Sequence, residues 1–170
     1  MKGESELRDN IIKYLSEWFV CDKEVWSDNR DGRIDIVAIH KSDINKEHPF
    51  GIEVKIGTKK TGKDIGAWLK QAHGYTNMIF PPYGKLIILT CPQVSGRYLE
   101  EGWEMTKHDV KRSGFYYCQH NVNTFLGSFG IGELQKYDNK YSRMVWKGVK
   151  FWDSINDNFR IEEIKRIWKM

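Results

Sequence analysis

The sequence predicts an α/β fold, in which helices pack against a mixed sheet. Three observations favour this class. Apolar residues recur at helical spacing from about Glu4 to Phe19. Two short runs rich in β-branched residues, Arg33 to His40 and Phe50 to Ile56, are joined by a polar connection. A further amphipathic helix then precedes a continuous apolar run, Lys85 to Cys91, of the kind found in buried strands.

Length and composition fit one soluble globular domain. A chain of 170 residues is long enough for a single proper core, and 40% of its residues are hydrophobic and 29% charged. The net charge of +4 favours a polyanionic partner only mildly. Cys21, Cys91 and Cys118 form no C-x-x-C pair, which argues against a disulfide framework or structural zinc and fits a reducing compartment. Because the start lacks an apolar signal core and no long apolar run occurs, we expect a cytoplasmic protein without a membrane segment.

The first helix is predicted over Glu4 to Phe19, with one broad apolar stripe facing a core. Glu4 lies on the line of that stripe, whereas Glu6 belongs to the polar side. A short strand is expected over Lys23 to Trp26, followed by turn-forming residues up to Gly32. The order therefore begins with a helix and a strand.

The strands Arg33 to His40 and Phe50 to Ile56 carry the residues of greatest chemical interest. Consecutive strands with a short connection are most simply an antiparallel hairpin, which would bring Asp35 and Glu53 side by side. Alternation along the second strand puts Glu53 and Lys55 on one face and apolar residues on the other. An acid and a lysine that project together from a strand are tolerated if they bind a metal or each other.

A second helix is predicted over Ile65 to Ile79, after a loop from Gly57 to Gly66. Pro81 and Pro82 end this helix, and the helical crossover makes the strand Lys85 to Cys91 parallel to its neighbour. The inward positions of the helix are Trp68, Leu69, Ala72, Tyr75, Thr76 and Ile79.

Positive charge concentrates between residues 53 and 70, where lysines outnumber acids. Such a patch would neutralise phosphate groups, although a solvated loop explains the same charges equally well. The lysines concerned are Lys55, Lys59, Lys60, Lys63 and Lys70.

Residues 94–170 carry a weaker signal, and we expect them to form an α+β elaboration packed on a core made by residues 1–93. Ser142 to Phe151 shows no clean period, whereas Arg160 to Trp168 has the spacing of an amphipathic helix. No chemical motif is assigned to this half. Its other expected elements are a helix over Glu104 to Arg112 and short strands over Phe115 to Cys118 and Thr124 to Phe129.

Asp35, followed by Glu53-Val54-Lys55, resembles the PD-(D/E)xK phosphodiesterase superfamily, in which an acid on one strand precedes acid-x-lysine on the next. The order of elements in residues 4–91 is similar to that superfamily's common core, and Gln71 and Tyr75 resemble the Gln-x-x-x-Tyr pair of its exonuclease V-like branch. Ile34 replaces the proline of the name motif, at a loose position. The resemblance covers about half the chain. It implies a restriction-endonuclease-like core of a helix, an antiparallel three-strand meander, a helix and a parallel fourth strand.

The resemblance implies a metal-dependent nuclease that hydrolyses phosphodiester bonds of DNA, with RNA open as an alternative substrate. Asp35, Glu53 and the main-chain carbonyl of Val54 would bind Mg²⁺ or Mn²⁺, which prefer oxygen ligands. Lys55 would orient or deprotonate the attacking water, or stabilise the developing anion. The Gln-x-x-x-Tyr pair lies on one helix face and would reach the same phosphate.

Members of the superfamily often carry a third acid on the first helix, and we assign Glu4 to that position as a metal ligand, with Glu6 as the second choice. Asp31 ranks below Asp35 as a ligand, and His73 is assigned to the surface. The small chain suits a phage or mobile-element nuclease, a junction- or end-processing enzyme, or a subunit of a larger complex. The aromatic-rich second half would then supply DNA contacts or a homodimer surface.

Two other classes of protein stay open. A catalytically inactive nucleic-acid-binding module with the same fold would bind DNA without cutting it. A structural or inhibitory partner protein would carry Asp35 and Glu53 as ordinary hairpin residues, and Glu53→Ala would then leave its stability unchanged or higher. Separately, Tyr75 could equally be an inward core residue and Gln71 a plain surface residue.

Overall fold

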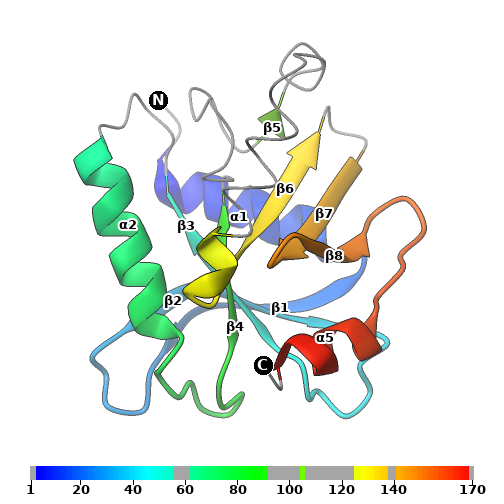
Figure 1. Ribbon diagram of the computed structural model, residues 1–170, viewed down its shortest axis with the longest axis horizontal. Helices are drawn as coiled ribbons and strands as arrows, with labels where there is room; N and C mark the ends of the chain where they lie inside the picture. The colour runs from blue at the N-terminus through cyan, green and yellow to red at the C-terminus, as the bar shows by residue number, and fades with distance from the viewer. Residues whose placement is uncertain (1–2, 56–61, 92–103, 106–124, 138–140, 169–170) are drawn as a thin grey trace.

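A computed structural model describes residues 3–55, 62–91, 104–105, 125–137 and 141–168 (Figure 1). Helices pack on a mixed sheet of order β1-β2-β3-β4-β6-β7-β8, with β5 paired to β6, so the predicted α/β class is confirmed. The principal helices are α1 (Glu4–Leu15), α2 (Gly62–Tyr75) and α5 (Ile161–Trp168). The strands are β1 (Phe19–Trp26), β2 (Arg33–His40), β3 (Phe50–Val54), β4 (Ile87–Cys91), β5 (Glu104–Met105), β6 (Ile131–Tyr137), β7 (Tyr141–Trp146) and β8 (Val149–Asp153).

The first helix is shorter than predicted, because it ends at Leu15 and Phe19 begins β1. The Ser16 hydroxyl donates to the carbonyl of Lys13 at 2.7 Å, which closes the last turn. Phe19 is buried and pairs with His40 at the far end of β2. The helical prediction failed here because an apolar residue at helical spacing also fits a strand that begins in the same core.

The first four strands place two antiparallel pairs beside one parallel pair. β2 is antiparallel to both β1 and β3, and Ile36 lies opposite Ile52. β4 then joins β3 in parallel, with Val54 opposite Cys91, and α2 forms the crossover between them. The amino end of β2 and the carboxyl ends of β3 and β4 therefore meet at one edge of the sheet (Figure 1).

Helices α1 and α2 cover separate apolar cores. Leu7, Ile11 and Leu15 of α1 belong to a cluster with alternate residues of β2, β3 and β4. Ala72 and Tyr75 of α2 belong to a second cluster, which includes residues of β2, β4 and β6. The second helix begins at Gly62 and ends at Tyr75, both earlier than predicted, so Ile79 lies outside the helix and is exposed.

Strands β6, β7 and β8 continue the sheet beyond β4. β6 is parallel to β4, and β7 and β8 follow as antiparallel neighbours. Their apolar side chains, together with Ile164 of α5, join the α1 core, and the amphipathic helix expected near the end of the sequence is confirmed by α5. The residues that join that core from the strands are Leu134, Met144, Phe151 and Trp152.

Two expectations for the second half were wrong where the structure describes them. Residues 125–128 are helical, and the rings of Phe125 and Phe129 lie 5.1 Å apart, one helical turn from each other in sequence. Glu104 and Met105 form β5 rather than the start of a helix. The remainder of that expected helix and the strand expected over Phe115 to Cys118 lie outside the described residues. Among the helices that the structure describes, none is long and apolar enough to cross a membrane.

Candidate metal centre

The candidate centre lies where the ladder between β2 and β3 stops. The last regular pair joins Ile36 and Ile52. At the next position the side chain of Asp35 replaces its main chain as the partner of β3: Oδ2 accepts a hydrogen bond from the main-chain N–H of Val54 at 2.8 Å. The Asp35 carboxylate is buried, and this hydrogen bond to β3 holds it between the two strands.

Glu53 remains in the ladder on the other side, opposite Thr90 of β4. Its side chain is only 1% exposed, and neither carboxylate oxygen has a hydrogen-bond partner among the described residues. Oε1 lies 2.7 Å from the Lys55 ammonium, with which it forms an ion pair. A carboxylate buried in this way is expensive, because the ion pair with Lys55 replaces only part of its interactions with water.

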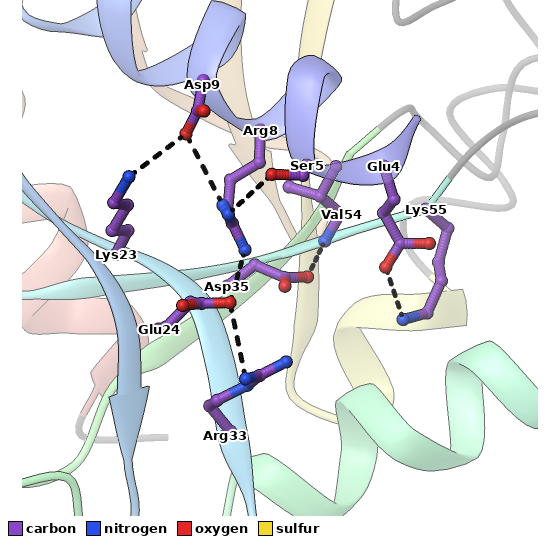
Figure 2. Close-up of polar contacts among 10 residues, drawn as sticks. All are labelled: Glu4, Ser5, Arg8, Asp9, Lys23, Glu24, Arg33, Asp35, Val54 and Lys55. Atoms are coloured by element: carbon purple, nitrogen blue, oxygen red, sulfur yellow. Dashed lines mark hydrogen bonds and ion pairs between the residues drawn. The ribbon is translucent and has the colours of Figure 1, made fainter. Parts of the chain in front are cut away.

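Lys55 links Glu53 to the start of α1. Its Nζ lies 3.4 Å from Glu4 Oε1, and Figure 2 shows these two side chains meeting from different elements. Its main-chain N–H donates to the carbonyl of Cys91 at 3.0 Å, which keeps the residue aligned with β4. One lysine thus faces two acids that lie far apart in the sequence.

Burial dominates the ionisation of this cluster. It raises the pKa of Glu53 to about 7, and the neighbouring charge of Asp35 adds to the rise while Lys55 opposes it. Burial also raises the pKa of Asp35, against the lowering effect of the Val54 N–H. For Lys55, burial disfavours the ammonium, but the contact with Glu53 and the surrounding acids outweigh it and raise the pKa. Lys55 therefore stays protonated beside carboxyl groups that resist ionisation.

Gln71 and Tyr75 contact each other on α2. The Gln71 amide donates to the Tyr75 hydroxyl at 2.7 Å, and that hydroxyl donates to the main-chain carbonyl of Arg33 at 2.9 Å. Burial raises the pKa of Tyr75, and the charges of Glu53, Lys55 and Asp35 also act on it. Within the described residues neither side chain hydrogen-bonds to the acids, so the pair borders the centre and ties α2 to β2.

No family model, curated protein or solved structure matches this chain. Among the described residues, no group of three His, Cys, Asp or Glu side chains already converges as a metal shell. Asp35 and Glu53 nevertheless offer buried carboxylate oxygens at one place, the carbonyl of Val54 follows between the charged residues, and Glu4 approaches from α1. This all-oxygen donor set suits Mg²⁺ or Mn²⁺.

The structure also shows the surroundings of the residues that were weaker candidates for the site. Glu6 and Asp31 are exposed, and Asp31 accepts a hydrogen bond from Ser27 within its turn. His73 is exposed, with its Nδ1 2.8 Å from the carbonyl of Phe129. Lys70 is exposed on α2. Lys59 and Lys60 lie outside the described residues, as does the side chain of Lys63.

Sequence reasoning missed two residues beside the centre. The side chain of Arg8 is 11% exposed and contacts Glu24 at 2.8 Å. Its positive charge opposes the rise that burial causes in the pKa of Asp35. The signal that would have found Arg8 is its spacing, one helical turn after Glu4 on the same side of α1. Nothing in the local sequence marks Glu24.

Proposed function

We propose that this chain is a metal-dependent nuclease of the PD-(D/E)xK type, which hydrolyses phosphodiester bonds in DNA. The observation that carries the proposal is the Glu53 carboxylate, which is 1% exposed, lacks hydrogen bonds among the described residues and lies beside Asp35. A divalent cation would offset the cost of burying these acids together. The helix, antiparallel meander, helix and parallel strand of α1 to β4 support a restriction-endonuclease-like core.

Asp35, Glu53, the carbonyl of Val54 and Glu4 would hold the cation. Asp35 is already oriented, because Oδ2 is fixed by the Val54 N–H and Oδ1 has no partner among the described residues. The chemistry supplied by Mg²⁺ in such a centre is polarisation of the phosphoryl group and a lowered pKa for an attacking water. Glu4 belongs to a different element, so it would bind only when α1 is packed against the sheet.

Lys55 would act as a cation. Its raised pKa and its position among acids keep the ammonium charged, which suits orientation of water and stabilisation of negative charge in the transition state. We therefore prefer these roles to proton abstraction. Gln71 and Tyr75 would contact the substrate phosphate from the border of the centre, after the Gln71 amide leaves its partner.

A second candidate function is an inactive nucleic-acid-binding module with the same fold. The observation in its favour is the ion pair between Lys55 and Glu53, which balances one buried charge without a metal. That module would bind DNA equally well in chelator and would release no product.

Cleavage and metal binding should be measured together. Single-stranded, duplex and branched DNA, with an RNA counterpart, would be incubated with Mg²⁺, Mn²⁺ or chelator. Wild type would be compared with Asp35→Asn, Lys55→Ala and a control, Lys165→Ala, which removes an exposed lysine paired with Glu162 on α5. We expect metal-dependent cutting by wild type and the control only.

The results separate the candidates. DNA binding without cutting under either metal would favour the inactive module. If the protein neither binds nor cuts nucleic acid, and Mg²⁺ does not raise its melting temperature, the nuclease proposal is wrong.

A further inference from the structure

The backbone of β1 is strained next to the candidate centre. Glu24 has a φ of 56°, although it lies inside a strand and is not glycine. The ladder between β1 and β2 pairs Lys23 with Ile36 and Val25 with Ile34, and it omits Glu24 and Asp35 between them. Such a conformation persists only where surrounding contacts compensate for it.

The compensating contacts come from two arginines on different elements. Glu24 Oε1 lies 2.8 Å from Nη1 of Arg8 on α1 and 3.4 Å from Nη1 of Arg33 on β2. Figure 2 shows both guanidinium groups meeting this one carboxylate, close to Asp35. We call Arg8, Glu24 and Arg33 the Glu24 cluster. Its position beside the centre is also seen in the electrostatic effect of Arg8 on Asp35.

The cluster has more donors than its own acid can satisfy. One oxygen of Glu24 accepts a hydrogen bond from Arg8 and forms a longer ion pair with Arg33, and each guanidinium carries five N–H donors. Arg8 Nε is buried without a hydrogen-bond partner among the described residues, and Ser5 Oγ receives only one further bond, at 3.1 Å. Arg8 also has Asp9 at 3.8 Å, beyond hydrogen-bond distance. Unused guanidinium donors suit a second anion.

Arg33 is much the more exposed of the two arginines, since the side chain of Arg8 is only 11% exposed. The Arg33 side chain is 45% exposed, and its guanidinium lies over the Trp26 ring, 5.5 Å from the centroid. Trp26 is itself 51% exposed. The ring and Glu24 thus hold an exposed arginine in one place, at the same edge of the sheet as Asp35. A planar guanidinium presents a fork that matches the oxygens of a phosphate group.

We propose that Arg33 binds a phosphodiester group of the nucleic-acid strand next to the scissile one, and that Glu24 and Arg8 position it. This inference rests on the proposed nuclease function, and it names the contact that would hold the substrate strand at the centre. The ligand is a nucleic-acid strand, because Arg33 would bind one phosphate group while the adjoining metal centre would bind the next one along the strand. A single free anion would not contact both Arg33 and the metal centre.

The test measures DNA affinity in chelator, where no cutting occurs, at several salt concentrations. Arg33→Ala should weaken binding to all DNA sequences alike and reduce the slope of log K against log salt by about one. Arg33→Lys should restore the slope, because charge returns, but not the full affinity, because the fork is lost. The matched control is Arg166→Ala, an exposed arginine 2.6 Å from Glu163 on α5, which should change neither value.

A double-mutant cycle tests the positioning role of Glu24. Arg33→Ala should lose less affinity in a Glu24→Gln background than in wild type, because Arg33 is no longer held there. Additive effects would overturn the positioning role. Inorganic phosphate, compared with chloride at equal ionic strength, should not displace the DNA selectively, and selective displacement would indicate a free-anion site instead.

The inference and the proposed function can fail separately. If Arg33→Ala leaves the salt slope unchanged while wild type cuts DNA with Mg²⁺, the Glu24 cluster is structural and the inference is wrong. If binding depends on Arg33 but no metal supports cutting, Arg33 is a phosphate contact of an inactive binding module, and the nuclease proposal fails together with the part of the inference that places Arg33 beside a scissile group. If wild type does not bind nucleic acid, both are overturned.

Discussion

At the scale of single residues, the balance of charge around Glu53 decides what the centre can do. Glu4, Asp35 and Glu53 bring three carboxyl groups toward one ammonium, that of Lys55. Because Glu53 is buried, its ionised form is costly even with the Lys55 ammonium 2.7 Å away, unless a metal ion also binds it. We propose that the fold tolerates this cost because Glu53 binds a metal ion.

Glu53→Gln should therefore stabilise the metal-free protein. The pKa rise from 4.5 to about 7 corresponds to a penalty of roughly 3 kcal/mol at high pH, and a buried amide without partners retains part of it. We expect a gain of about 1–3 kcal/mol in the free energy of unfolding at pH 8, measured by urea denaturation in chelator. Glu162→Gln, at an exposed position on α5, is the control.

A stability gain alone would also fit an ordinary hairpin acid, so the same variant must be examined with metal. Wild type should gain stability from Mg²⁺ because the ion binds only the folded state, and Glu53→Gln should lose most of that gain. Equal stabilisation of both proteins would remove Glu53 from the metal site.

The stability of the metal-free protein should also depend on pH in a defined direction. Because the pKa of Glu53 is raised in the folded state, the native protein binds more protons than the unfolded chain between about 4.5 and about 7. Its free energy of unfolding should therefore fall as pH rises through this window, and the fall should be smaller in Glu53→Gln. Urea titrations at closely spaced pH values in chelator would measure it, and a rise over the same window would contradict the assignment.

At the scale of elements, the middle of the sheet leaves no room for a side chain in place of Gly132 on β6. A Cβ on Gly132 of β6 would lie 2.6 Å from the carbonyl oxygen of Val145 on β7 and 2.7 Å from Cδ2 of Leu89 on β4. The first of these is backbone, which cannot rotate away. Close packing at this point lets β6 join the parallel strands, whose carboxyl ends carry the candidate centre, to the antiparallel second half of the sheet.

Gly132→Ala should consequently lower the free energy of unfolding by about 1–3 kcal/mol, as overpacking does in other cores. Gly66→Ala is the matched control, because Gly66 lies in α2 with nothing within 4 Å of its added Cβ. That control should gain up to about 1 kcal/mol from improved helix propensity. Chemical denaturation of both variants measures the difference, and two equal values would show that β6 can shift.

At the scale of the whole molecule, one core joins the two halves of the chain. Trp152 packs edge-on against Phe19 at 5.0 Å and against Trp18 at 5.4 Å, and Phe50 stacks on Phe151 at 5.2 Å. β6 also covers the edge of β4 that β3 does not. The residues after position 93 thus supply part of the core on which α1 rests.

A fragment of residues 1–93 should accordingly fail to unfold cooperatively. It would expose the edge of β4 and lose the side chains that fill the α1 core, so we expect a broad denaturation curve and aggregation. Circular dichroism during urea denaturation, together with size-exclusion chromatography, would test this. A sharp transition with the full chain's stability would mean that residues 94–170 are dispensable for folding.

Much of the first half could be predicted from sequence because the signal there is local. The spacing of Leu7, Ile11 and Leu15 predicts the helix, and alternation around Glu53 predicts which side chains share a face. The same logic failed at Phe19 and at Phe125. At Phe19 the spacing indicated a buried side chain but not whether a helix or a strand buries it, whereas Phe125 lies in a helix and is 61% exposed.

The sequence by itself determined the α/β class, the order of the hairpin strands, and Asp35, Glu53 and Lys55 as the candidate site residues. Only the tertiary structure decided that Glu4 faces Lys55, that Glu53 is buried without hydrogen bonds among the described residues, and that Glu24 gathers two arginines beside Asp35. The physical reason is that burial and electrostatic effects depend on groups from distant parts of the chain, whereas periodicity depends on near neighbours.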